Sequence, residues 1–161
     1  MAKESALESL KKDYIEIQKK YPLPSFEKLN EDFQVEKISE VETDFLIREI
    51  RKFIADKFSN YLRFIEAILH PVNAPMFIFS VIKSIEDKER KKLTETYKKL
   101  AKTEVKLIEL DLEFVEKKEI DFIKESYEIW QEIKKDLLDV VNIIKKNWDN
   151  KFEGNKKCYF G

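Results

Sequence analysis

The chain has 161 residues, of which 39% are charged and 43% hydrophobic, and its 31 basic and 32 acidic side chains leave a net charge of −1. Twelve phenylalanines can supply a core, so the high charge content is not a sign of disorder. Only two glycines occur, Gly154 and Gly161, which excludes a P-loop, a glycine-rich dinucleotide turn and a nucleophile elbow from the first 153 residues. With one histidine and one cysteine, the composition also argues against a zinc site, a disulfide framework and histidine-based catalysis.

The sequence predicts an all-α fold, a helical bundle of four principal helices with two short helical segments. We expect a single helical-bundle domain over residues 1–152 and a flexible C-terminal tail over residues 153–161. The first twenty-one residues are charged throughout, and the longest apolar run, residues 74–82, has about half the length that a membrane span needs. We therefore expect a cytoplasmic protein with no transmembrane segment.

The first predicted helix covers about residues 3–20, and its apolar residues recur at spacings of three and four, which places them in one narrow seam. Pro22 and Pro24 should end this helix, because proline lacks a backbone donor and clashes with the preceding turn. Ser25 can then cap a short helical turn. The apolar residues of the seam are Leu7, Leu10, Tyr14, Ile17 and Tyr21, and those of the short turn are Phe26, Leu29 and Phe33.

The second long helix is predicted from near Ser39 to about Leu69. Ser39 and Glu42 have the spacing of a capping box, in which two side chains satisfy backbone N–H groups of the first turn. The apolar stripe of this helix is wider than that of the first, so we expect it to lie at the centre of the bundle. The predicted core residues, here and in later helices, include Phe53, Phe58, Tyr61, Ile65, Tyr127, Trp130 and Val141.

Residues 76–82 are apolar all round, and periodicity alone does not decide between a helical turn and a strand. Ser84, with Asp87 three residues later, predicts the start of a charged helix. From there to Asn150 neither glycine nor proline occurs. A single helix of that length would be about 100 Å long. We therefore expect a reversal near residues 116–119, with one continuous helix as the alternative.

Residues 108–114 alternate between apolar and polar, which is the period of a half-buried strand. A lone strand would leave its backbone groups without partners, so we interpret the segment as helix with a second contact face. We expect Ile108 and Val115 to face the core, and Leu110 and Phe114 to be covered by the first helix, with a dimer contact as the alternative. Together with the apolar run, this face supplies the candidate partner surface: Leu110, Leu112, Phe114, Met76, Phe77 and Phe79.

Four acidic residues lie close together at Glu109, Asp111, Glu113 and Glu116. Helical bundles can bind two metal ions between such carboxylates, but they use Glu-x-x-His motifs, and the only histidine here, His70, precedes a proline at a predicted helix end. We interpret the acids as a solvated face and His70 as a C-terminal cap. The sequence therefore predicts no cofactor, no metal site, no catalytic residue and no small-molecule substrate.

The charges fall in blocks along the second half of the chain. Residues 83–106 carry a net charge of +4 and residues 107–139 a net charge of −6. If the chain reverses between the two blocks, the basic helix lies antiparallel to the acidic one and the charges complement each other. The alternative is that the basic helix contacts nucleic acid, through Lys88, Arg90, Lys91, Lys92, Lys98, Lys99 and Lys102.

Cys158 is fourth from the end, the position of a prenylated cysteine, but the bulky aromatic residues after it are a poor match to that motif. We expect a frayed tail with a free thiol. With no catalytic motif present, the sequence favours a non-enzymatic interaction or structural module that presents helix faces to a protein partner or to a second copy of itself. Nucleic-acid binding through residues 83–106 is the alternative function.

Overall fold

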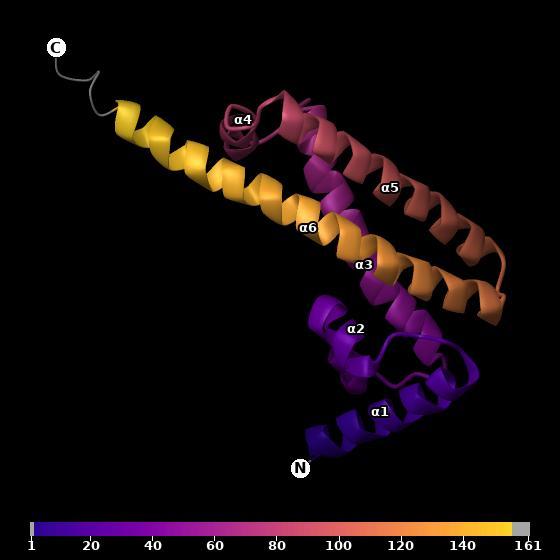
Figure 1. Cartoon of the computed structure of the whole chain (residues 1–161). Coiled ribbons are helices and arrows are strands. Elements are labelled where there is room, and N and C mark those ends of the chain that lie inside the picture. The colour runs from indigo at the N-terminus through magenta and orange to yellow at the C-terminus, as the bar shows by residue number, and fades with distance from the viewer. Residues whose placement is uncertain (1, 156–161) are drawn as a thin grey trace. The chain divides into compact units, whose positions relative to one another are not determined.

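The computed structural model describes residues 2–155 of the chain, with side chains for residues 4–148 (Figure 1). All regular elements among these residues are helical, so the predicted all-α class is confirmed. The four long helices and two short ones are accompanied by a 3-10 turn, η1, that the sequence did not predict. The elements are α1 (Ala2–Lys20), α2 (Phe26–Phe33), η1 (Val35–Glu40), α3 (Leu46–Leu69), α4 (Met76–Ile82), α5 (Asp87–Leu112) and α6 (Glu116–Asn155).

The chain divides into two compact units. Unit 1 comprises Met1–Asn60 and Lys102–Trp130, and unit 2 comprises Tyr61–Ala101 and Gln131–Gly161. The helices α3, α5 and α6 each continue from one unit into the other. The single domain predicted for residues 1–152 stays a prediction, and most of the predicted tail, residues 156–161 with Cys158, lies outside the described residues.

Two predicted helix caps are wrong. Ser39 does not cap α3; it lies in η1, where its hydroxyl donates to the Glu36 carbonyl (2.7 Å). The preceding segment turns inward because Val35 and Ile38 are buried, and α3 begins only at Leu46. Ser84 likewise donates its hydroxyl back to the Ser80 carbonyl (3.1 Å) instead of capping α5.

The predicted cap of α2 is confirmed, because the Ser25 hydroxyl accepts a hydrogen bond from the Lys28 backbone N–H (3.4 Å). At the start of α5, a carboxylate provides the cap: Glu89 Oε2 accepts a hydrogen bond from the Glu86 backbone N–H (3.2 Å). Such caps satisfy backbone donors that have no partner inside the helix. Local side chains therefore decide where α2 and α5 begin.

In unit 1, the core is built around three aromatic rings. Phe33 of α2, Phe58 of α3 and Trp130 of α6 are buried, with ring centroids 5.9–6.3 Å apart. Tyr14 of α1 is buried against Phe26, and its hydroxyl donates to the Pro24 carbonyl (2.6 Å). This burial, with the nearby charge of Glu27, raises the pKa of Tyr14 above its ordinary value. These contacts attach α1 and the following turn to the rest of unit 1.

In unit 2, all four helical segments contribute aliphatic side chains to the core. The buried residues are Ile65 and Ile68 of α3, Ile78 and Val81 of α4, Leu93 and Leu100 of α5, and Ile133, Leu137 and Val140 of α6. Residues 76–82 are therefore a helix with one buried side, which settles the ambiguity left by periodicity.

Five of the seven predicted core residues lie inside or at the edge of a core, and two predictions are wrong. Phe58, Ile65 and Trp130 are buried, and Phe53 and Tyr127 are half-buried. Tyr61 is 36% exposed and Val141 39% exposed. Val140 takes the core position on α6, and its neighbour is turned about 100° away from it. Tyr61 lies at the edge of the wide stripe on α3.

The predicted reversal is confirmed, although it comes slightly earlier than expected, at residues 113–115 between α5 and α6 (Figure 1). The continuous-helix alternative is wrong. In unit 2, Lys92 pairs with Asp139 (3.0 Å) and Lys99 with Glu132 (2.8 Å), and in unit 1 Lys106 pairs with Glu125. The partners step by seven residues up one helix and down the other, so the basic and acidic blocks complement each other as predicted.

The aromatic core of unit 1 can be tested by a pair of phenylalanine substitutions. Phe58→Ala should lower the free energy of unfolding by about 3–5 kcal/mol, because it leaves a cavity between Phe33 and Trp130. Phe45→Ala, which removes a mostly exposed ring, should cost less than about 1 kcal/mol. Urea denaturation measures both. Equal losses would contradict the described core.

The ion pairs between α5 and α6 can be tested by exchanging charges. Lys99→Glu and Glu132→Lys should each lower Tm by about 2–4 °C, because each puts like charges side by side. The double exchange restores the pair and should return Tm to within about 1 °C of the parent. In 1 M NaCl the differences should shrink, since salt screens exposed pairs. If the Tm of the double variant were no higher than that of the single variants, Lys99 and Glu132 would not be paired as described.

Candidate functional site

An exposed apolar seam on α5 is the main candidate site of unit 1. Val105, Ile108 and Leu112 are 67%, 61% and 78% exposed, and their spacings of three and four place them on one side of the helix. The other side of α5 in this unit is buried through Leu107 and Leu110. We call these three exposed residues the α5 seam. It is apolar surface that the described chain leaves uncovered.

The exposure of the α5 seam shows that the predicted orientation of the alternating segment, residues 108–114, is partly wrong. The segment is helical up to Leu112 and Leu110 is covered within the chain, both as expected. Ile108, which was expected to face the core, is exposed instead. Two residues along a helix correspond to about 200°, so alternating residues point to opposite sides. Phe114 and Val115 lie beyond the end of α5 and are exposed, and Phe114 does not share a covered face with Leu110.

Next to the end of the seam, two exposed aromatic rings enclose an arginine. The Arg48 guanidinium lies 4.4 Å from the centroid of the Phe114 ring and 5.1 Å from that of the Phe45 ring. All three side chains line a cleft of about 620 Å³, which α1 borders with Asp13, Glu16 and Ile17. Stacking on the guanidinium orients both rings.

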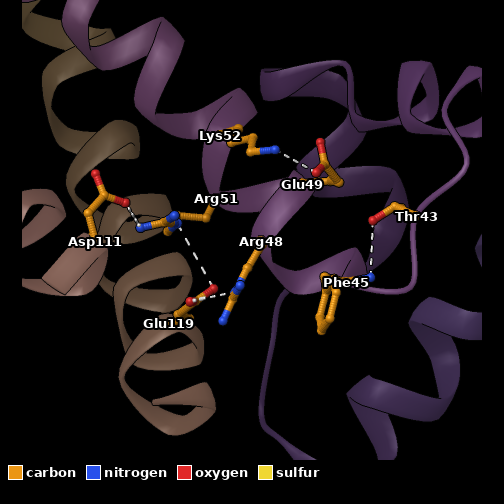
Figure 2. Close-up of polar contacts among 8 residues, drawn as sticks. All are labelled: Thr43, Phe45, Arg48, Glu49, Arg51, Lys52, Asp111 and Glu119. Atoms are coloured by element: carbon orange, nitrogen blue, oxygen red, sulfur yellow. Dashed lines mark hydrogen bonds and ion pairs between the residues drawn. The ribbon is translucent and has the colours of Figure 1, made fainter. Parts of the chain in front are cut away.

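Arg48 and Glu119, which both line this cleft, belong to an ion-pair cluster that joins three helices (Figure 2). Arg48 Nε of α3 lies 3.3 Å from Glu119 Oε1 of α6, and Arg51 Nη1 donates to Asp111 Oδ1 of α5 (2.8 Å). The Glu119 side chain is 3% exposed. Its Oε2 lies 4.0 Å from Arg51 Nε, and neither atom has a hydrogen-bond partner among the described residues. Because these charges are buried, removing one of them would leave its partners uncompensated, which lowers stability.

The acidic residues of the predicted acidic face form hydrogen bonds with different partners. Lys118 donates to Glu109 (2.8 Å) and to Glu113, and the Tyr21 hydroxyl donates to Glu116 (2.9 Å). The hydrogen bond from Lys118 lowers the pKa of Glu109, and the two carboxylates raise the pKa of Lys118. Over the part of the chain that the structure describes, no three potential ligands gather around a common point.

The seven basic residues of the nucleic-acid alternative have mixed surroundings. Lys92 and Lys99 pair with acids of α6, and Lys98 pairs with Glu95 (2.9 Å) on its own helix. The hydrogen bond to Asp139 raises the pKa of Lys92. Of the other four, Lys88, Lys91 and Lys102 are exposed and Arg90 is half-buried. The α5–α6 pairing therefore occupies part of the proposed basic surface.

The second predicted surface, on α4, belongs to unit 2. Met76, Phe77 and Phe79 are 82%, 59% and 40% exposed, while Ile78 and Val81 of the same helix are buried. The Phe77 ring lies 6.0 Å from that of Trp148 on α6. The structure thus leaves Leu112, Phe114, Met76, Phe77 and Phe79 of the predicted partner residues exposed and buries only Leu110.

Sequence reasoning missed Val105, Ile108 and the arginine cluster. One signal was available: the spacings of three and four from Val105 through Ile108 to Leu112 run beside a second series at Leu107 and Leu110. No comparable signal marks Glu119, since acids are frequent all along α6.

Comparison with known protein families, curated proteins and solved structures finds no significant match to this chain. Within the described residues, no helix is both long enough and apolar enough to span a membrane.

The buried carboxylate can be tested against an exposed one on the neighbouring turn. Glu119→Gln should lower the free energy of unfolding by about 3 kcal/mol, because it leaves the charges of Arg48 and Arg51 without their buried partner. Glu116→Gln changes an exposed carboxylate and should alter the denaturation midpoint little. Urea denaturation of both variants measures the difference. Equal denaturation midpoints for the two variants would mean that the cluster contributes nothing to stability.

Proposed function

We propose that the protein is a non-enzymatic helical interaction module of the cytoplasm, and that its docking face is the α5 seam. The observation that carries the proposal is the exposure of Val105, Ile108 and Leu112 on the side of α5 opposite its core contacts. Helices of water-soluble domains usually have one apolar side, and a second apolar side is typical of a contact surface.

The geometry favours a helix as the occupant. The seam extends over two turns with spacings of three and four, and a helix that docks against another helix presents the same pattern. Phe114 and Val115 follow directly after the seam and are also exposed, so apolar surface continues past the end of α5. Phe114 is oriented by its contact with Arg48. The orientation reduces the ordering cost when a partner packs against the ring.

The charge of unit 1 favours a partner protein over a second copy of this chain. Unit 1 has 16 basic and 22 acidic residues, a net charge of −6. Beside the seam lie Glu104, Glu109, Asp111 and Glu113. Lys118 and Arg51 compensate part of this charge, but unit 1 keeps its net charge of −6. Two copies meeting at their seams would bring two such units together, and like charges across an interface are unfavourable. We therefore propose an amphipathic partner helix with lysine or arginine flanking its apolar residues.

Two designed peptides test this proposal. Both carry leucine and isoleucine at heptad a and d positions, and the flanking positions are all lysine in one peptide and all glutamate in the other. The lysine-flanked peptide should bind the full chain at least tenfold more tightly than the glutamate-flanked one, measured by fluorescence anisotropy at 50 mM salt. The chain alone should have the mass of a monomer.

The seam variant for this experiment is Ile108→Gln with Leu112→Gln, and the matched control is Ile15→Gln, which removes an exposed apolar side chain of α1. Binding of the lysine-flanked peptide should fall at least tenfold in the seam variant and stay unchanged in the control. Equal binding by all three chains, or no binding by any, would overturn the proposal. A mass that rises with concentration and returns to monomer in the seam variant would identify a second copy as the occupant instead.

The nucleic-acid alternative has less support, because Lys92, Lys98 and Lys99 pair with acids of the chain itself. It can be tested by measuring the affinity of the chain for duplex and single-stranded nucleic-acid probes at low salt. Affinity weaker than the ~10⁻⁴ to 10⁻⁶ M of non-specific binders would exclude it.

A further inference from the structure

Unit 2 carries an apolar projection that is independent of the α5 seam. Met76 and Phe77 begin α4 and are 82% and 59% exposed, and Val72, in the preceding connection between Pro71 and Pro75, is also exposed. Phe79 adds a partly exposed ring one turn further on. The buried side of α4, through Ile78 and Val81, attaches this projection firmly to the unit.

Two basic residues lie near the projection. Trp148 contacts Phe77, and the exposed Lys145 lies on the same side of α6, three residues before Trp148. Lys83 directly follows α4, where its backbone N–H donates to the Phe79 carbonyl (3.1 Å). Unit 2 as a whole has 15 basic and 10 acidic residues, a net charge of +5, although the complete chain has a net charge of −1.

The form of the projection favours a lipid surface over a protein helix. At seven residues, α4 has fewer than two turns, so it cannot present the three or four turns of apolar stripe that pack along a partner helix. Insertion between lipid headgroups needs only a few bulky apolar side chains, with lysines nearby to contact anionic headgroups. Tryptophan is suited to that boundary, because its ring is apolar and its N–H is polar.

We propose that the α4 projection of unit 2 docks the protein on anionic lipid surfaces. Met76, Phe77 and Phe79 enter the headgroup region, while Lys83 and Lys145 lie against the negative charges. The contact is peripheral and reversible.

Vesicles test the proposal on the full chain. Binding to vesicles of phosphatidylcholine with 30% phosphatidylglycerol should be at least tenfold stronger than to pure phosphatidylcholine, and should weaken as salt rises. Trp148 provides a second signal, because its emission should shift to shorter wavelength on binding. Trp130 is buried in the core of unit 1 and should not respond.

The projection variant is Met76→Ser with Phe77→Ser, and the matched control is Phe45→Ser, which removes an exposed ring from the acidic unit 1. The projection variant should bind anionic vesicles at least tenfold more weakly and lose the emission shift, whereas the control should bind like the parent. Lys145→Glu should weaken binding at least fivefold, since each lysine near an anionic surface contributes about fivefold. Circular dichroism should show unchanged helix content in each variant.

Three results would overturn the proposal: no binding to anionic vesicles at low salt, equal binding by the projection variant and the parent, or a loss of helix content that accounts for the weaker binding. Duplex DNA that binds as tightly as the vesicles, without dependence on Met76 and Phe77, would identify a general polyanion surface instead. If the glutamate-flanked peptide binds and the projection variant abolishes its binding, the occupant is an acidic protein and not a lipid.

Discussion

The antiparallel pairing of α5 with α6 is the interaction on which the rest of the structure depends. On α5 the buried positions recur at spacings of three and four, at Leu93, Thr96, Leu100, Thr103, Leu107 and Leu110. The lysines that pair with α6 each directly precede one of these positions. Exposed ion pairs add little stability individually, so the apolar residues supply the energy and the ion pairs favour one register.

The same pairing explains how so highly charged a chain avoids self-repulsion. The basic block of α5 faces the acidic block of α6, and the division of the chain into two units leaves unit 1 acidic and unit 2 basic. Each unit also exposes one apolar feature, the α5 seam in unit 1 and the α4 projection in unit 2. Opposite charge beside similar apolar surface favours different partners for the two features, which is why a basic helix and an anionic lipid surface are proposed separately.

Part of the candidate site could be predicted from residue spacing. Leu112, Phe114 and the α4 residues were expected to be available to a partner, and they are exposed. Ile108 was placed on the wrong side, because an alternating segment in a helix has apolar residues on both sides and its period does not say which side meets the core. The cluster of Arg48, Arg51 and Glu119 depends on residues about 70 positions apart, and no local pattern brings them together.

The sequence by itself determined the helical class, the breaks at the two proline pairs, the cap of α2 and the charge complementarity that accompanies the reversal. These follow from local chemistry: side-chain period, missing backbone donors and the sign of charge. Tertiary structure decided the start of α3 at Leu46, the exposure of Tyr61 and Val141, and which side of α5 is covered. Those features depend on how a helix is rotated against its neighbours, and that rotation is set by packing between residues distant in sequence.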